Sequence, residues 1–345
     1  MARKVTVRDV AAAAGVSTAT ASRALTNSPS VNAEMARRVL KASSDLGYSA
    51  NVFARALRTQ RTDTMGMVVP SISNAYFTAA VEAVEKELAD SGRSLILCDA
   101  RESVETEAQR IELLVQRMVD GLIVVPVTAY DSVPAIEQAV RHAPVVLLDR
   151  WADAAGADYV GGDNADGLRQ CVAHLREQGC RSIVYVGAHP RTSTADERHQ
   201  AFRGLMEPEP EPEREPRTAH APGVHGSALL GDFSVEWGVE AARQLLSGDE
   251  LPQGIVCGAD VIAVGVLGML REVGVVVPDQ VKVVGYDDSF LGRVTMPRLT
   301  SVRQPIDAMA AEAVRLLDDR AGRTDAPVRK SVFGPSLVVR ESSGG

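Results

Sequence analysis

The stretch TVRDVAAAAGVSTATASRAL, residues 6–25, predicts two short helices separated by a tight turn. Thr6 is a favourable N-cap for a helix that ends at Gly15, because glycine readily adopts the left-handed conformation that closes a helix. Ser17 is placed to cap a second helix that continues to Leu25. Two short helices joined through Gly-Val-Ser are typical of a helix-turn-helix, whose second helix enters the major groove of DNA.

A third helix is expected from about Asn32 to Leu46, because apolar residues recur there at helical spacing. Together the three helices would form a small unit with its own core. The apolar side chains expected in that core are Val10, Val16, Leu25, Met35, Val39 and Leu46.

The second helix begins with side chains that suit contact with DNA. Thr18 and Ala19 can approach base edges closely, and Arg23 can donate two hydrogen bonds to a guanine. Thr20 and Ser22 are better suited to phosphate contacts, which orient a protein on DNA. The alternative is that these hydroxyls only cap and solvate a surface helix.

The charge distribution is that of a polyanion-binding unit or, alternatively, of a basic surface patch without a partner, and the charge alone does not decide between the two. Residues 1–61 contain ten Lys or Arg against three acids, whereas the remainder carries 27 basic and 42 acidic side chains. A basic segment of charge +7 on an acidic body of charge −15 is typical of a polyanion-binding module on a larger carrier.

The segment from Asn51 to Arg58 is about two helical turns long, too short to form a stable helix alone. Phe53 and Leu57 are four residues apart and would share one helical face. The segment is therefore either a helix that forms only with a partner or a plain basic linker.

These features resemble the DNA-binding region of the lactose-repressor (LacI) family of bacterial transcription regulators. The resemblance rests on Thr6-Val-Arg-Asp-Val-Ala, on Gly15 to Leu25 and on Asn51 to Arg58, and it extends to Leu337-Val-Val-Arg-Glu-Ser-Ser343. It implies that residues 51–58 form a hinge helix that pairs across a dyad, folds on DNA and inserts Leu57 into the minor groove.

The family resemblance also implies which residues contact DNA. They lie in the first helix cap, the second helix, the turn after it and the hinge: Thr6, Ser17, Thr18, Ala19, Thr20, Ser22, Arg23, Asn27, Tyr48, Asn51, Ala54, Arg55, Leu57 and Arg58.

From Thr64 onward, short β-branched runs alternate with helical stretches, which predicts parallel sheets with crossover helices. Expected strands are 65–69, 95–98, 122–125, 145–148, 183–186, 255–257 and 281–284. Expected helices are 75–89, 105–119, 132–140, 165–178, 197–206, 235–246 and 260–273. The acidic, proline-rich segment 207–216 is expected to be an extended loop.

The fold class is therefore an all-α helix-turn-helix head followed by an α/β body. By the resemblance, that body is two-lobed like periplasmic sugar-binding proteins, with two doubly wound parallel sheets. The expected domains are the head (1–50), the hinge (51–62) and the body (63–345). The N-lobe would comprise about 63–162 and 291–321 and the C-lobe 163–290 and 322–341, with crossings near 161–163, Phe290 and Ala321.

Polar and aromatic side chains lie where the expected strands of both lobes end. Such groups at strand ends suit a polyhydroxylated or heterocyclic ligand in the cleft between the lobes. Seven of them match effector-pocket positions of the family: Tyr76, Phe77, Asp163, Thr194, Arg198, Phe233 and Asp287. The remaining candidates are Asn74, Arg150, Ser193 and Asp260. Each could instead form a surface or interlobe salt bridge.

The resulting hypothesis is a cytoplasmic, homodimeric repressor that binds a palindromic operator and senses a small molecule. A sugar is favoured, because Asp149-Arg150 is typical of sugar-responsive members; a purine or nucleoside is the alternative, because 75–77 and 232–233 resemble the purine-responsive repressor. A solute receptor or an α/β enzyme is disfavoured. The chain contains no GxGxxG after a strand, no GxxxxGK[ST] and no GxSxG, and no cofactor, metal or membrane partner is expected.

Overall fold

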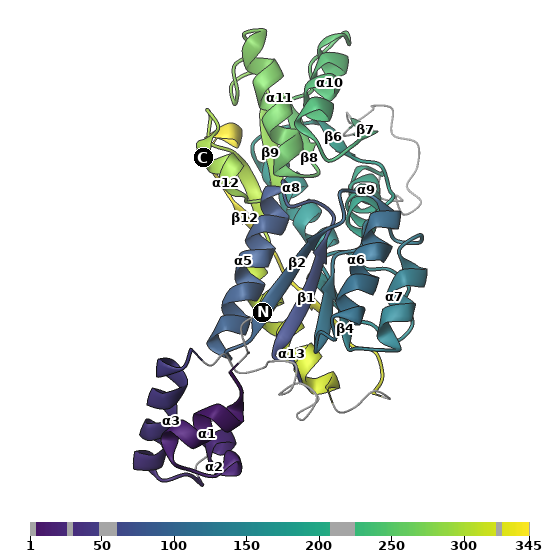
Figure 1. Ribbon diagram of the computed structural model, residues 1–345. Helices are drawn as coiled ribbons and strands as arrows, with labels where there is room; N and C mark the ends of the chain where they lie inside the picture. Colours follow the sequence, from purple (N-terminus) through teal and green to yellow (C-terminus); the bar gives the residue numbers. More distant parts are fainter. Residues whose placement is uncertain (1–4, 26–29, 48–60, 208–224, 322–325, 345) are drawn as a thin grey trace. The chain divides into compact units, whose positions relative to one another are not determined.

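The computed structural model describes residues 5–25, 30–47, 61–207, 225–321 and 326–344 (Figure 1). The chain divides into two compact units, Met1–Thr62 and Asp63–Gly345. We call them the head and the body and describe each by itself. The head boundary at residue 50 and the hinge at 51–62 fall mostly outside the described residues and stay predictions.

The head contains three helices, α1 (Val7–Ala14), α2 (Thr18–Leu25) and α3 (Ala33–Asp45). Thr6 caps α1 in a reciprocal capping box with Asp9, and Gly15 closes it at φ 65°. Asn32 caps α3 by accepting a hydrogen bond from the backbone N–H of Glu34 (2.8 Å). The predicted helix-turn-helix and its third helix are confirmed.

The core of the head consists mainly of alanine, which the sequence prediction missed. Val10 and Val39 are fully buried as expected, and Val16 and Leu25 pack against the core. Met35 and Leu46 are exposed, so their placement in the core was wrong. The helices approach closely because five small side chains lie between them: Ala11, Ala14, Ala21, Ala24 and Ala42.

The N-lobe of the body contains a six-stranded sheet in the order β11-β5-β4-β3-β1-β2. Its strands are β1 (Thr64–Val69), β2 (Ser94–Asp99), β3 (Gly121–Val124), β4 (Val145–Leu148), β5 (Asp158–Gly162) and β11 (Lys330–Phe333), and all its pairs are parallel. Helices α5 (Ala75–Asp90) and α13 (Ile306–Arg320) cover one face. Helices α6 (Val104–Gln116) and α7 (Val133–Val140) cover the other (Figure 1).

The C-lobe contains the second six-stranded sheet, in the order β12-β10-β9-β8-β6-β7. Its strands are β6 (Ser182–Ala188), β7 (His225–Gly231), β8 (Gly254–Cys257), β9 (Lys282–Asp287), β10 (Thr300–Arg303) and the antiparallel edge strand β12 (Ser336–Val338). Helices α10 (Val235–Leu246) and α11 (Asp260–Glu272) cover one face, and α8 (Asn164–Glu177) and α9 (Ser193–Met206) cover the other. The short helices α12 (Phe290–Val294) and η1 (Glu341–Ser343) complete the lobe.

The chain crosses between the lobes at three places, two of which differ from the prediction. The first lies at Asp163, as expected. The second lies at 304–305, not near Phe290, because β10 still pairs with β9 of the C-lobe. The third lies at 334–335, not near Ala321, because β11 pairs with β5 of the N-lobe. The sequences of β10 (TSVR) and β11 (KSVF) are too short and too polar to be predicted as strands.

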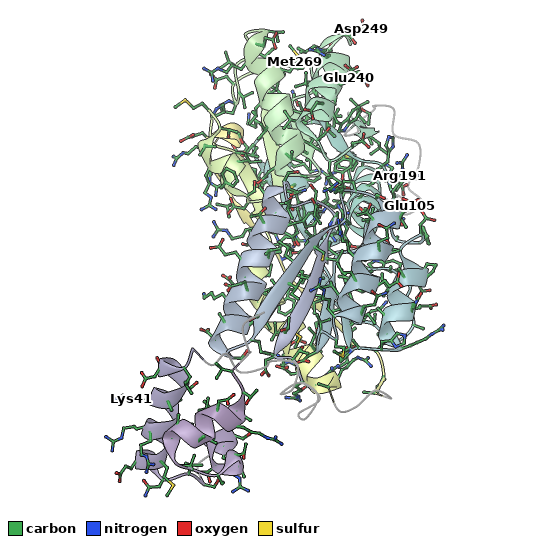
Figure 2. The ribbon with its side chains drawn as sticks, in the orientation of Figure 1. Lys41, Glu105, Arg191, Glu240, Asp249 and Met269 are labelled. Carbon is green, nitrogen blue, oxygen red and sulfur yellow. The ribbon has the colours of Figure 1, made fainter. Side chains whose placement is uncertain are left out.

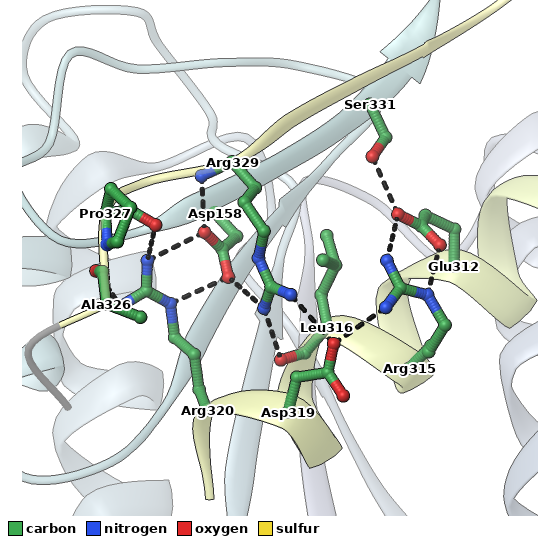
Figure 3. A network of polar contacts seen from close by, with 10 residues as sticks. All are labelled: Asp158, Glu312, Arg315, Leu316, Asp319, Arg320, Ala326, Pro327, Arg329 and Ser331. Carbon is green, nitrogen blue, oxygen red and sulfur yellow. Dashed lines mark hydrogen bonds and ion pairs between the residues drawn. The ribbon is translucent and has the colours of Figure 1, made fainter. Parts of the chain in front are cut away.

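A buried ion-pair network fastens α13 to the edge of the N-lobe sheet (Figure 3). Asp158 is fully buried and accepts hydrogen bonds from Nε and NH2 of Arg320, both at 2.7 Å. The backbone N–H of Arg329 donates to the same carboxylate (2.7 Å). Around it, Arg315 bridges Glu312 and Asp319 on the exposed side of α13. The network therefore joins the end of α13 to β5 and to the segment that leads into β11.

Candidate functional site

In the head, α2 presents its predicted DNA-contacting side chains away from the core. Ser17, Thr18, Ala19 and Arg23 are exposed, as is Thr6 at the start of α1. The opposite face of α2 is buried through alanines. The exposed face therefore consists of small, hydroxylated and basic groups, the chemistry that reading a major groove requires.

Hydroxyls at the start of α2 also stabilise the helix. Ser17 Oγ accepts a hydrogen bond from the backbone N–H of Thr20 (3.1 Å) and lies 2.8 Å from the Thr20 hydroxyl. Thr20 and Ser22 are half-buried. Lys41 projects outward from α3 and adds positive charge to the head (Figure 2). The remaining predicted DNA contacts lie outside the described residues: Asn27, Tyr48, Asn51, Ala54, Arg55, Leu57 and Arg58.

In the body, a cavity of ≈ 640 Å³ opens between the strand ends of the two lobes. The N-lobe lines it with Asn74 and Arg150, and the C-lobe lines it with Thr192 and Phe233. Asn74 also caps α5 by accepting a hydrogen bond from the backbone N–H of Tyr76 (2.9 Å). The predicted cleft is thus present and bordered by both lobes.

Arg150 is a buried side chain of this cavity with unused hydrogen-bonding capacity. It is 4 % exposed, and its guanidinium carbon lies 5.1 Å from the ring centre of Phe77 and 5.5 Å from that of Phe233. Among the described residues it makes one hydrogen bond, from NH1 to Pro126 O (3.3 Å), and its Nε has no partner. Burial lowers the pKa of this guanidinium. A buried guanidinium needs acceptors, and a ligand with oxygen atoms would supply them.

Beneath the cavity, two aspartates from different lobes are joined through one amide. Tyr76 donates a hydrogen bond from Oη to Asp149 Oδ1 (2.7 Å). Gln304 donates from Nε2 to Asp287 Oδ1 (3.2 Å) and, more weakly, to Asp149 Oδ1 (3.5 Å). Both aspartates have positive φ, 65° for Asp149 and 106° for Asp287. Such conformations cost free energy for residues other than glycine and are concentrated at functional sites.

Arg198 holds the C-lobe side of this cluster together. It is buried, donates from Nε to Asn164 Oδ1 (2.8 Å) and from NH1 to Gly258 O (2.8 Å), and lies 3.8 Å from Asp287 Oδ1. Its guanidinium carbon is 3.6 Å from the ring centre of Tyr286. Burial by itself would lower the pKa of Arg198, but the surrounding Tyr286 and Asp287 outweigh it and raise that pKa. Arg198 therefore remains a cation that orients Asn164 and Asp287.

Burial also shifts the pKa values of two aspartate carboxylates, Asp287 and Asp260. It raises the pKa of Asp287 well above its usual value, although nearby Arg198 lowers it in part. It raises the pKa of Asp260 to about 6. Asp260 accepts hydrogen bonds from Ser301 Oγ (2.6 Å) and from the backbone N–H of Ser289 (2.7 Å), so its carboxylate is occupied by the protein.

Several other predicted effector residues are also occupied by the protein. Asp163 caps α8 through the backbone N–H of Asp166 (2.9 Å). Ser193 Oγ accepts a hydrogen bond from the backbone N–H of Trp151 (2.9 Å), and Thr194 is buried beside Thr192 (3.3 Å between hydroxyls). Tyr76 and Asp287 border a second cavity, of ≈ 940 Å³, between α5, α12 and the segment 303–308.

The sequence reasoning missed three residues that join this site, namely Asn164, Glu197 and Gln304, and it noted Trp151 at a strand end without assigning it to the effector set. Gln304 follows β10, a strand that was not predicted, so no strand end pointed to it. Nothing in the sequence selects Glu197 beyond its position directly before Arg198, a predicted effector residue. Within the described part of the chain, no group of three or more His, Cys, Asp or Glu could hold a metal ion, and no helix could span a membrane.

The head and the body each match a known protein family. Residues 6–51 match the family described as bacterial regulatory proteins, lacI family, and residues 172–343 match a periplasmic binding protein-like domain. The ribose operon repressor of Halalkalibacterium halodurans is 31% identical over 340 residues, covering 99% of this chain and 97% of that protein. The HTH-type transcriptional repressor PurR of Mannheimia succiniciproducens is 30% identical over 338 residues, covering 98% of both chains.

Solved structures agree with the fold. The lac repressor dimer bound to operator and the anti-inducer ONPF has a TM-score of 0.83 at 24% identity and covers 99% of both chains. The complex of the transcriptional regulator CelR with cellobiose has a TM-score of 0.69 at 28% identity, covering 98% of this chain and 100% of that one.

Proposed function

Because the chain belongs to the LacI family of bacterial regulatory proteins and is a DNA-binding transcriptional regulator, we propose that it acts as a repressor whose DNA binding is controlled by a small molecule. It binds an inverted-repeat operator as a homodimer, and a small molecule in the 640 Å³ cavity changes its affinity for that operator. The relatives that establish the family are named repressors, so no enzymatic activity is part of this proposal. The protein acts in the cytoplasm, where bacterial DNA lies.

The exposed face of α2 supports the DNA-binding part of the proposal. Thr18 and Ala19 lie at the N-terminal end of the helix, and the exposed Arg23 follows more than a turn later. We assign base contacts to these three residues and phosphate contacts to Thr20 and Ser22. The hinge helix at 51–58, with Leu57 as its minor-groove wedge, stays part of the proposal as an expectation from the family.

Exposed apolar side chains on the body support the homodimer. Ile96 and Leu97 are exposed on β2, which is an edge strand. Phe290, Val294 and Met296 are exposed on and after α12. Exposed apolar side chains beside one another in the chain and unpaired strand edges are costly in water and can mark protein contacts. A two-fold dimer would bring two heads to the two halves of an inverted repeat.

The single observation that carries the effector part is Arg150, a buried guanidinium with unused donors in a cavity between two lobes. Aromatic rings flank the guanidinium, and the cavity also contains carboxylates and hydroxyls. A polyhydroxylated sugar matches these groups, since its oxygens accept from Arg150 and its C–H faces pack on rings. The similarity to a sugar-bound regulator supports this choice.

The test of DNA binding is a selection from randomised duplexes followed by a salt titration. We expect an inverted repeat to be enriched. The affinity for that repeat should fall with salt at a log-log slope of about −0.9 per neutralised phosphate. Enrichment of no repeat, or equal affinity for a scrambled duplex, would refute the operator proposal.

A further inference from the structure

Trp151 connects the two lobes through both its backbone and its side chain. It follows β4 of the N-lobe, and its backbone N–H donates to Ser193 Oγ (2.9 Å) on α9 of the C-lobe. Its indole Nε1 donates to Glu197 Oε1 (2.8 Å), one turn further along α9. One N-lobe residue is therefore held at two points on a C-lobe helix.

Glu197 continues the connection into the C-lobe. Its second oxygen, Oε2, accepts from Nδ2 of Asn164 (2.7 Å), and Asn164 Oδ1 accepts from Arg198 Nε (2.8 Å). Both Glu197 oxygens thus have partners, one in each lobe. Glu197 is half-buried, so these hydrogen bonds are partly shielded from water.

The contacts return to the N-lobe next to their starting point. From Arg198 they pass to Asp287 (3.8 Å), from Asp287 to Gln304 (3.2 Å), and from Gln304 to Asp149 (3.5 Å). Asp149 precedes Trp151 by two residues. The two neighbours of Arg150 are therefore both fixed by this circuit, whereas among the described residues Arg150 itself makes a single hydrogen bond.

We propose that Trp151 and Glu197 are positioning residues that join the lobes and hold Arg150 in the cavity before any ligand enters. The circuit consists only of the chain's own groups. A guanidinium that is fixed in advance loses less freedom when a ligand binds, which increases affinity. This inference rests on the proposed effector site, but its test requires no effector.

The test measures how readily phenylglyoxal modifies Arg150 in the ligand-free, full-length protein, by peptide mass spectrometry. Trp151→Phe keeps an aromatic ring but removes the indole donor, and Glu197→Ala removes both acceptors. Each should accelerate modification of Arg150 by roughly 2- to 12-fold, the change expected from one lost hydrogen bond. Glu197→Gln keeps one acceptor and should give an intermediate rate.

The matched control is Trp237→Phe. The Trp237 indole donates to Gly187 O (2.9 Å) within the C-lobe, so the modification rate of Arg150 should stay at the wild-type value. Arg320, which is 5 % exposed in the N-lobe network, serves as the reference within each digest.

A second measurement uses the same control variant. In Trp237→Phe, Trp151 is the remaining tryptophan of the chain. The tryptophan fluorescence of this variant therefore reports only on Trp151 and its contact with Glu197. Adding Glu197→Ala should increase quenching by acrylamide. The proposal is overturned if Trp151→Phe and Glu197→Ala leave the Arg150 rate at that of Trp237→Phe. It is also overturned if Arg320 accelerates equally, because the pair would then stabilise a whole lobe. If the wild type failed to bind an inverted-repeat operator, by contrast, the proposed function would be refuted. The effect of Trp151 and Glu197 on the modification rate of Arg150 would still stand.

Discussion

Three consecutive residues after β4 have three different tasks. Asp149 accepts hydrogen bonds beneath the cavity, Arg150 lies in it, and Trp151 contacts the other lobe. The left-handed backbone of Asp149 (φ 65°) turns the chain sharply at this point. The strain at Asp149 is offset by the hydrogen bonds that Tyr76 and Tyr159 donate to it.

Arg23 is the residue of α2 whose substitution tests base reading most directly. Arg23→Ala should weaken operator binding by roughly 1–3 kcal/mol and relax the preference at one base position in each half-site, because a bidentate guanine contact is lost. Lys41→Ala, on α3, should weaken binding to all sequences alike. Sequencing the duplexes that each variant selects measures its base preference at every position. An unchanged base preference in Arg23→Ala would show that Arg23 does not contact a base specifically.

Asp260 should make the body less stable as pH rises. Its pKa is raised to about 6 from a usual 3.8, so the folded state holds a proton that the unfolded state releases between those values. The stability contribution is present at low pH and is lost as pH rises through about 6. A neutral amide can replace the protonated acid between Ser289 and Ser301.

Asp260→Asn should therefore gain stability relative to the wild type as pH rises from 4.5 to 7.5, by up to about 2 kcal/mol. Urea unfolding at both pH values measures this difference. Asp249→Asn, an exposed carboxylate on the same lobe, should track the wild type (Figure 2). A difference between Asp260→Asn and the wild type that is the same at both pH values would contradict the assignment.

At the scale of elements, the network around Asp158 adds polar contacts between α13, β5 and the segment before β11 to the apolar packing of α13 on the sheet. Burial alone would raise the pKa of Asp158, but hydrogen bonds from Arg320 and Arg329 outweigh it and lower that pKa. The resulting stability is present above the ordinary aspartate pKa near 4 and is lost as pH falls below it.

Asp158→Asn should destabilise the body by about 3–5 kcal/mol at pH 7, because it leaves the buried Arg320 guanidinium without its charge partner and removes one of the two carboxylates that Arg329 contacts. Asp318→Asn, whose carboxylate is 53 % exposed and pairs with Arg93, should cost below about 1 kcal/mol. Thermal unfolding compares the two variants. A similar loss in both would show that burial adds nothing to the Asp158 pairs.

The elements that could be predicted are those whose pattern is local. The helix caps at Thr6, Gly15 and Asn32 and the apolar runs of β1, β3 and β4 are visible in a few adjacent residues, and the expected body elements appear with ends shifted by up to four residues. β10 and β11 were missed because short polar strands are stabilised by their neighbours in the sheet, which the sequence does not show. The two misplaced lobe crossings follow from these missed strands.

The same limit applies to the site. Arg150 and Arg198 were predicted, and the structure brings both to the interlobe region. Nothing local to Glu197 or Gln304 indicates that their partners are Trp151 and Asp287, since the first pair forms only when the two lobes meet and the second only when β10 pairs with β9. Asp163 and Asp260 were expected to contact a ligand, but the structure shows them bonded to backbone amides.

At the scale of the molecule, the account joins a DNA-reading unit and a ligand-sensing unit in one chain. A ligand can change DNA affinity only if it binds the DNA-competent and the DNA-incompetent states unequally. A cavity between two lobes meets that condition, because any change in lobe closure alters its contacts with the ligand. By linkage, the operator must then change the affinity for the ligand by the same factor.

The most direct test is the operator dissociation constant measured by fluorescence anisotropy, with and without a ligand identified by thermal shift across sugars and purines. The account predicts a change of at least about 5-fold in the wild type. In Arg150→Ala the ligand should produce no change, while binding to the operator alone stays at the wild-type level. A ligand that stabilises the protein through Arg150 yet leaves the operator dissociation constant unchanged would contradict it.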